Sequence, residues 1–158
     1  MTVSRSKKKE STSRGKGQSA SIMPVEGIEP YIAKVGEKYM NKKQLDHFRK
    51  MLNAWKQDLE NEITRTVHNM RDEPENPPDP NDRASQETDM SLELRSRDRE
   101  RKLIKKINEA IDRINTGEYG YCDNCGVEIG IERLEARPTA EMCIDCKTVD
   151  EIREKQMG

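Results

Sequence analysis

The chain contains four cysteines, arranged as two identical C-x2-C pairs, Cys122–Cys125 and Cys143–Cys146, with seventeen residues between the pairs. A C-x2-C turn brings two thiolates to one point, and two such turns complete the tetrahedral sulfur set that Zn²⁺ prefers. Disulfides require an oxidising compartment, and the polar, basic start of the chain does not resemble a secretory signal. A thioredoxin-type redox motif has a single C-x-x-C beside a βαβ pattern. The spacing therefore predicts one structural zinc ion, held by Cys122, Cys125, Cys143 and Cys146.

Composition limits how the rest of the 158-residue chain can fold. Charged residues make up 37% of the sequence and hydrophobic residues 32%, which is too little apolar material for a thick core along the whole chain. Such a composition suits long exposed helices and a small module stabilised by its metal. No apolar run is long enough to cross a membrane, and a net charge of -1 is unlike that of proteins that coat nucleic acid. We therefore expect a soluble, cytoplasmic protein.

The first forty residues divide into two parts. Residues 1–25 are rich in Ser, Lys and Gly, and the stretch up to Ser21 has six basic residues and one acidic residue. We interpret 1–25 as a disordered basic tail. Residues 26–40 carry a proline, two glycines and two tyrosines, and we expect them to form an N-terminal segment that packs on the globular domain.

Residues 41–115 are predicted to form an antiparallel helical hairpin. Asn41 followed by Gln44 is typical of a capping box at the start of a helix. The prolines that begin at position 74 end this helix, because proline lacks the donor N–H. Asp79 is a suitable N-cap for a second helix, with Pro80 at its first position. The short turn between the two helices makes them antiparallel neighbours.

Each helix of the hairpin carries a narrow apolar seam. In the second helix the seam is Ile104, Ile107, Ile111 and Ile114, and Gly117 is the predicted stop. Apolar residues of the first helix recur at spacings of 3 and 4, as in the a and d positions of a coiled coil, and continue in a shifted register: Leu45, Phe48, Leu52, Trp55, Leu59, Ile63, Val67 and Met70.

Residues 116–158 are predicted to form the zinc domain and a C-terminal helix capped by Thr148 and Glu151. The predicted fold is therefore mainly α, with a long antiparallel two-helix coiled-coil hairpin, a small globular zinc-finger domain with four cysteine ligands, and a C-terminal helix. The hairpin carries an acidic tip at 72–84, and the zinc domain lies at its base.

Two function classes are disfavoured by the residues around the cysteines. Six acidic residues and two arginines lie between Cys122 and Cys146, whereas a DNA-binding finger needs positive surface charge. We therefore expect no independent sequence-specific DNA binding. Four sulfur ligands leave no open position for catalysis on zinc. The sequence offers no Gly-rich phosphate loop, and the two histidines, His47 and His68, are isolated, so we do not expect an enzyme.

Two clusters of like charge remain to be explained. Eight acidic residues lie between Asp72 and Glu93, with one arginine among them. They form either a solvated tip or a feature that reaches a basic pocket or a divalent cation in a partner. A basic row on one face of the second helix is either solvated surface or a docking face for an acidic partner or a phosphate-rich ligand. The row consists of Arg95, Arg99, Lys102 and Lys106, and Arg137 and Lys147 could add to it.

Several runs of the sequence are similar to a known family. These are Pro78-Asp-Pro80 with Asp82-Arg-Ala84, Ser91-Leu-Glu-Leu-Arg95, Arg97 to Lys106, Gly120 to Ile131, Leu134-Glu-Ala-Arg-Pro-Thr139, and Cys143-Ile-Asp-Cys-Lys147. In these runs, and over the chain from about Val25 to its C-terminus, the sequence resembles the DksA/TraR family of zinc-finger transcription factors. Residues 1–24 match poorly. Some members lack the cysteines, whereas this chain keeps all four.

The resemblance implies a function and a set of site residues. Its members bind RNA polymerase directly through the secondary channel, destabilise promoter complexes and act with ppGpp, repressing ribosomal RNA promoters and activating amino-acid biosynthesis promoters. The chain is expected to act as a monomer. The implied tip residues are Asp79, Asp82 and Ala84; the implied ppGpp and polymerase interface is Leu103, Lys106, Arg137 and Lys147; further implied polymerase contacts are Arg99 and Arg133.

Three other functions fit part of the pattern. A transcript-cleavage factor of the Gre type would also use a hairpin with acidic residues, although its globular domain is different. A zinc finger that binds DNA and a zinc-stabilised interaction module are the remaining alternatives.

Overall fold

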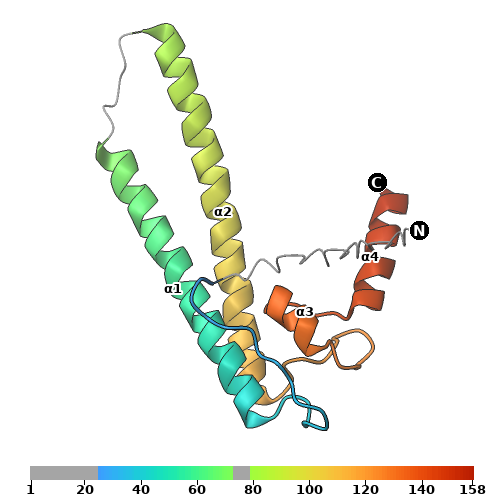
Figure 1. Cartoon of the computed structure of the whole chain (residues 1–158). Helices are drawn as coiled ribbons and strands as arrows, with labels where there is room; N and C mark the ends of the chain where they lie inside the picture. Colours follow the sequence, from blue (N-terminus) through green and yellow to red (C-terminus); the bar gives the residue numbers. More distant parts are fainter. Residues whose placement is uncertain (1–24, 73–78) are drawn as a thin grey trace, which may run out of the picture.

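The computed structural model describes residues 25–72 and 79–158. This part of the chain forms four helices: α1 (Lys42–Asp72), α2 (Pro80–Thr116), α3 (Ile131–Ala136) and α4 (Ile144–Met157). Helices α1 and α2 run antiparallel as a long hairpin, and α3 and α4 lie beside its lower half (Figure 1). The predicted mainly α fold, with its hairpin, four-cysteine module and C-terminal helix, is confirmed. The predicted turn at 73–78 and residues 1–24 of the predicted tail lie outside the described residues.

The ends of the two long helices follow from local sequence. Asn41 Oδ1 accepts the Gln44 N–H at 2.9 Å, and Gln44 Oε1 in turn accepts the Met40 N–H at 2.7 Å. The predicted cap is thus confirmed, with its return bond one residue earlier than in a standard capping box. Asp79 caps α2 by accepting the Asn81 N–H at 3.0 Å. Gly117 ends α2 in the left-handed region at φ +81°, where glycine carries no Cβ penalty.

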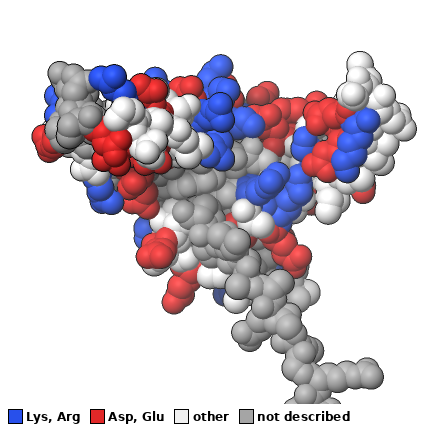
Figure 2. Space-filling model, turned by 90° about the horizontal axis from the view of Figure 1, so that it is seen from above, with Lys and Arg blue, Asp and Glu red and all other residues white. Residues whose placement is uncertain are grey.

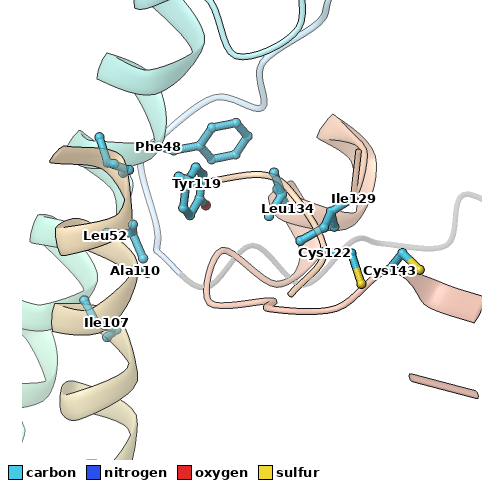
Figure 3. Packing of buried hydrophobic residues seen from close by; sticks show 10 residues of the cluster. Phe48, Leu52, Ile107, Ala110, Tyr119, Cys122, Ile129, Leu134 and Cys143 are labelled. Atoms are coloured by element: carbon cyan, nitrogen blue, oxygen red, sulfur yellow. The ribbon is translucent and has the colours of Figure 1, made fainter. Parts of the chain in front are cut away.

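The hydrophobic core lies where the base of the hairpin meets the zinc module. Phe48 of α1 and Ile107 of α2 are fully buried, as is Leu134 of α3. Tyr119 lies at the centre of this cluster (Figure 3): its ring contacts Phe48, and its hydroxyl donates to the Pro138 carbonyl at 2.7 Å. Because one core includes residues from both parts, the zinc module and the hairpin base form one packed unit.

The observed register of α2 corrects part of the predicted seam. Ile107 and Ile114 are buried as expected, but the third buried residue of this helix is Ala110. Ile104 and Ile111 are only partly buried. The reason is that α2 packs against both α1 and the zinc module at the base of the hairpin. Its buried face is therefore wider than a two-helix seam and is rotated relative to it.

Burial falls off sharply along the hairpin. Within the described residues, nothing after Leu52 in α1 and nothing before Ile107 in α2 is buried. Contact between the helices here involves polar groups: the Arg97 guanidinium lies 2.9 Å from the Met70 sulfur. Arg97 Nε and Glu100 Oε2 are buried without a hydrogen-bond partner. The distal hairpin is therefore held by less apolar burial than the base.

The segment before α1 is tied to the zinc module by its tyrosines. The Tyr39 hydroxyl donates to the Gly120 carbonyl at 2.7 Å and accepts the Gly130 N–H at 3.0 Å. The Tyr31 N–H donates to Glu135 Oε1 at 2.8 Å, and the same carboxylate oxygen lies 2.6 Å from His47 Nε2. His47 is half-buried and joins α1 to α3 through this contact. Among the described residues, no helix is both long and apolar enough to span a membrane.

Candidate functional site

Two short loops position the four cysteines. In the first loop, the Cys122 N–H donates to the Val127 carbonyl at 2.8 Å, and a positive φ of +75° at Gly126 reverses the chain behind Cys125. The second loop leads directly into α4. Cys143 is the N-cap of that helix, and its Sγ accepts the Cys146 N–H at 3.5 Å.

The predicted start of the C-terminal helix is wrong. Thr148 lies inside α4, where its hydroxyl donates to the Ile144 carbonyl at 2.8 Å. The helix begins earlier in the chain than predicted, with Cys143 as its N-cap. A Cys Sγ can accept a backbone N–H as the Ser and Thr oxygens do at an N-cap.

The four sulfur atoms fit a tetrahedral zinc ion. All four Sγ atoms lie within 4.8 Å of one another, and the Cys125 and Cys143 sulfurs are 3.7 Å apart. With Zn–S bonds of about 2.3 Å, the edge of a regular tetrahedron is about 3.8 Å. When bound, the ion joins the two loops; four sulfur ligands complete its coordination.

The surroundings of the sulfurs favour the thiolate at Cys122 and oppose it at Cys146. Burial opposes ionisation of Cys122, but backbone N–H groups at Cys143, Cys125 and Asn124 outweigh it and lower the pKa of the Cys122 thiol to about 6. The Asn124 side chain favours the Cys146 thiolate, yet the neighbouring sulfurs of Cys143 and Cys125 raise the pKa of the Cys146 thiol to about 12. Sulfurs this close oppose ionisation together unless a cation lies between them.

A second feature is a hollow between the hairpin and the zinc module. It has a volume of about 370 Å³. The structure brings together here all four residues expected at the ppGpp and polymerase interface: Leu103 and Lys106 from α2, Arg137 after α3, and Lys147 in α4. Seen from the tip end, blue side chains gather between the tip and α4 (Figure 2).

The two further arginines occupy different places. Arg133 also lines the hollow, and its Nε donates to the Met142 carbonyl at 3.2 Å, which holds the hollow's wall in place. Arg99 does not reach the hollow. It lies farther toward the tip, in a shallow depression on α2 shared with Arg95 and Lys102.

The tip residues are all solvent-exposed at the start of α2. Asp79 serves as the N-cap, while Asp82 lies in the first turn and Ala84 follows in the next. Helix capping accounts for the carboxylate of Asp79, so no bound ligand is needed to explain it. In the described residues the Asp82 carboxylate is not part of any metal-ligating group.

Two residues of the site region were not identified as such from sequence. Trp55 was predicted as a seam residue; it does pack against the base core, but it also lines the hollow. Glu141 lines the hollow from the zinc module. No periodic signal in the sequence marks Glu141, because its position depends on how the zinc loops fold back on α2.

The fold and the sulfur cage define a class of protein: a helical hairpin fused at its base to a zinc module with four cysteine ligands. Comparison with known families identifies it further. Residues 44–114 match the N-terminal domain model of DnaK suppressor protein DksA, and residues 117–151 match the prokaryotic dksA/traR C4-type zinc finger. The chain belongs to the DksA family, and the predicted structural zinc site is confirmed.

Curated relatives and solved structures agree with this assignment. The RNA polymerase-binding transcription factor DksA of Escherichia coli K12 is 61% identical over 143 residues, covering 90% of this chain and 95% of the relative. The protein of the same name from Haemophilus influenzae is 58% identical over 140 residues, covering 89% and 97%. The structure of transcription factor DksA2 from Pseudomonas aeruginosa aligns with a TM-score of 0.68 at 40% identity, covering 77% of this chain and 95% of the other.

Proposed function

We propose that the protein binds bacterial RNA polymerase and regulates the initiation of transcription together with ppGpp. The observation that carries the proposal is the 61% identity, over 90% of the chain, to a protein named as an RNA polymerase-binding transcription factor. It works as a monomer in the cytoplasm, where its polymerase is, and has no sequence-specific DNA site of its own. It is a regulator and not an enzyme, in keeping with the names of its relatives.

The hairpin is the part that enters the polymerase secondary channel. A rod with exposed carboxylates at one end can place Asp82 near the catalytic centre, while Asp79 keeps the end of α2 ordered. The negative charge acts there on the metal ions and basic groups of the polymerase, and the result is destabilised promoter complexes. Ribosomal RNA promoters are thereby repressed, and amino-acid biosynthesis promoters activated.

The hollow is the ppGpp site, completed by the polymerase surface. Lys106, Arg137 and Lys147 supply cationic donors suited to a pair of diphosphates. Leu103 provides an apolar contact beside them. Arg133 acts mainly by holding the 139–142 wall through its bond to Met142, whereas Arg99 meets an acidic surface of the polymerase along α2.

The Asp82→Asn variant tests the role of the tip. We expect it to bind polymerase as tightly as the wild type but to lose the effect on a ribosomal promoter in transcription by purified polymerase. Asp89→Asn, the same change on the same helix, is the matched control and should keep both properties. Equal loss of binding and effect in Asp82→Asn would contradict a tip-specific role. Cleavage of RNA 3′ ends in stalled elongation complexes would instead identify a factor of the Gre type.

The Lys106→Ala variant tests the ppGpp site. Loss of one phosphate contact should remove most of the response to ppGpp while leaving the ppGpp-independent effect on the promoter. The measurement is the half-maximal ppGpp concentration in the same transcription assay. An unchanged value would place the ppGpp site elsewhere.

A further inference from the structure

The hollow contains two side chains that a purely phosphate-binding site does not need. Trp55 reaches it from α1, and Glu141 reaches it from the zinc module, opposite in charge to Lys106, Arg137 and Lys147. A carboxylate among cations repels phosphate groups. Its presence therefore indicates that the ligand also presents hydrogen-bond donors.

Trp55 offers a flat surface held in a fixed place. It is half-buried and packs with part of its side chain against the base core, which contains Phe48 and Ile107. The exposed part lines the hollow. An aromatic ring fixed at the wall of a basic groove is the arrangement on which nucleic-acid bases stack. The chain contains a single tryptophan, so this surface has no substitute of its kind.

Glu141 is held in place by its backbone. Its carbonyl accepts the Asp123 N–H at 2.9 Å, and the carbonyl of the next residue, Met142, accepts Arg133 Nε at 3.2 Å. The wall that carries the carboxylate is thus tied to both the first zinc loop and α3. A guanine base presents N1–H and a 2-amino group side by side, which match the two oxygens of a carboxylate. Adenine presents an acceptor at N1 and has no 2-amino group.

Building on the proposed ppGpp site, we propose that Trp55 and Glu141 form its guanine-binding part. Trp55 stacks on the base, and Glu141 accepts hydrogen bonds from N1–H and the 2-amino group. Lys106, Arg137 and Lys147 hold the diphosphates. The hollow then selects a guanine nucleotide over an adenine nucleotide, because an adenine base leaves the carboxylate unpaired.

The first experiment measures base selection in transcription by purified polymerase. The probes are ppGpp and its adenosine counterpart ppApp, and the readout is the ratio of their half-maximal concentrations. For Glu141→Gln we expect the ppGpp value to rise about tenfold and the preference for ppGpp to fall by a similar factor. Glu151→Gln, an exposed change on α4, is the matched control and should alter neither value.

Variants of Trp55 separate stacking from packing. Trp55→Leu keeps apolar volume at the core but removes the ring, and we expect it to raise the half-maximal ppGpp concentration about tenfold. Trp55→Phe keeps a smaller ring and should restore most of the response. Polymerase binding and the ppGpp-independent promoter effect of each variant are measured alongside, so that a ppGpp response is compared only with that variant's own basal effect. A normal ppGpp response in Trp55→Leu, or an unchanged preference in Glu141→Gln, would overturn the inference.

A spectroscopic measurement does not depend on the variants folding well. Replacing the single tryptophan by 5-hydroxytryptophan gives one fluorophore that can be excited apart from the tryptophans of unlabelled polymerase. In the complex, ppGpp should quench this signal and ppApp should do so only at higher concentration. No change on adding ppGpp, while transcription still responds, would overturn the stacking role alone. A wild-type protein that binds polymerase but ignores ppGpp would overturn the proposed ppGpp site as well.

Discussion

The base and the distal end of the hairpin are built from the same two helices but are stabilised differently. At the base, Phe48 and Ile107 are fully buried against Tyr119 and the zinc loops. Toward the tip, α1 and α2 meet through half-buried and charged side chains, and no described residue there is buried. The comparison shows that apolar burial is concentrated beside the four cysteines, while the described residues toward the tip stay half-buried or exposed.

Removing zinc should have the largest effect on the difference in stability between the base and the distal end of the hairpin. The Cys143→Ser variant, or chelation of the metal, deprives the base of the link between its two loops. We expect a loss of stability greater than about 5 kcal/mol, more than any single core truncation. Amide hydrogen exchange should show lost protection near Tyr119 and Ile114, with little change in the first turns of α2. Retained protection at Tyr119 would show that the apolar core alone holds the base.

As the pH falls, zinc affinity should fall with one slope near neutral pH and with a steeper slope at lower pH. Zinc binding requires thiolates and displaces their protons, so affinity falls as pH falls. Because the pKa of Cys122 is lowered to about 6, this thiol is already ionised at neutral pH and adds no proton to the exchange. Below about pH 6 it becomes protonated, and zinc affinity should fall more steeply with pH. Competition with a chromogenic chelator across this range measures the slope; a constant slope would contradict the lowered pKa.

Two isoleucines on α2 test the difference in burial between the base and the distal hairpin. Ile107 is fully buried, and Ile104, one turn closer to the tip, is only partly buried. We expect Ile107→Ala to cost about 2–5 kcal/mol and Ile104→Ala about 1 kcal/mol. Chemical denaturation followed by circular dichroism gives both values. Equal costs would mean that the apolar seam continues past the base.

The smallest effect is expected at the tip itself. Asp79→Ala removes the side-chain acceptor for the Asn81 N–H, a loss of about 1 kcal/mol for a helix N-cap. Because the first turns of α2 are far from the base core, the loss should appear as fraying of those turns and leave the melting temperature nearly unchanged. Exchange of the amides at 81–84 measures it, and Asp79→Ser, which keeps a capping oxygen, is the control.

Local signals in the sequence predicted the helix ends well. Asn41, Asp79 and Gly117 each act within one turn of their own position, so their roles do not depend on the rest of the fold. The cysteine spacing predicted the zinc cage for the same reason, since each C-x2-C loop is a local structure. The C-terminal helix was the exception. Thr148 was predicted as its cap, but the helix is capped by Cys143, whose role depends on the fold of the zinc loop.

Features that depend on how three parts of the fold pack together were harder to predict from the sequence. Ala110, in place of Ile111, is buried because α2 faces α1 and the zinc module together. The residues of the hollow come from both long helices, from α3 and the segment after it, and from α4, so no spacing connects them. Lys106, Arg137 and Lys147 were assigned through family resemblance, whereas Trp55 and Glu141 required the folded arrangement.

The single packed core at the base makes the hairpin a lever with one fixed end. From Ile107 to the start of α2 is about 40 Å at 1.5 Å per residue, so a tilt of about one degree at the base moves the tip by about 0.7 Å. The position of Asp82 relative to the base is therefore decided around Tyr119, Phe48 and Leu134. A conservative substitution among these side chains can displace the tip, although all three are buried.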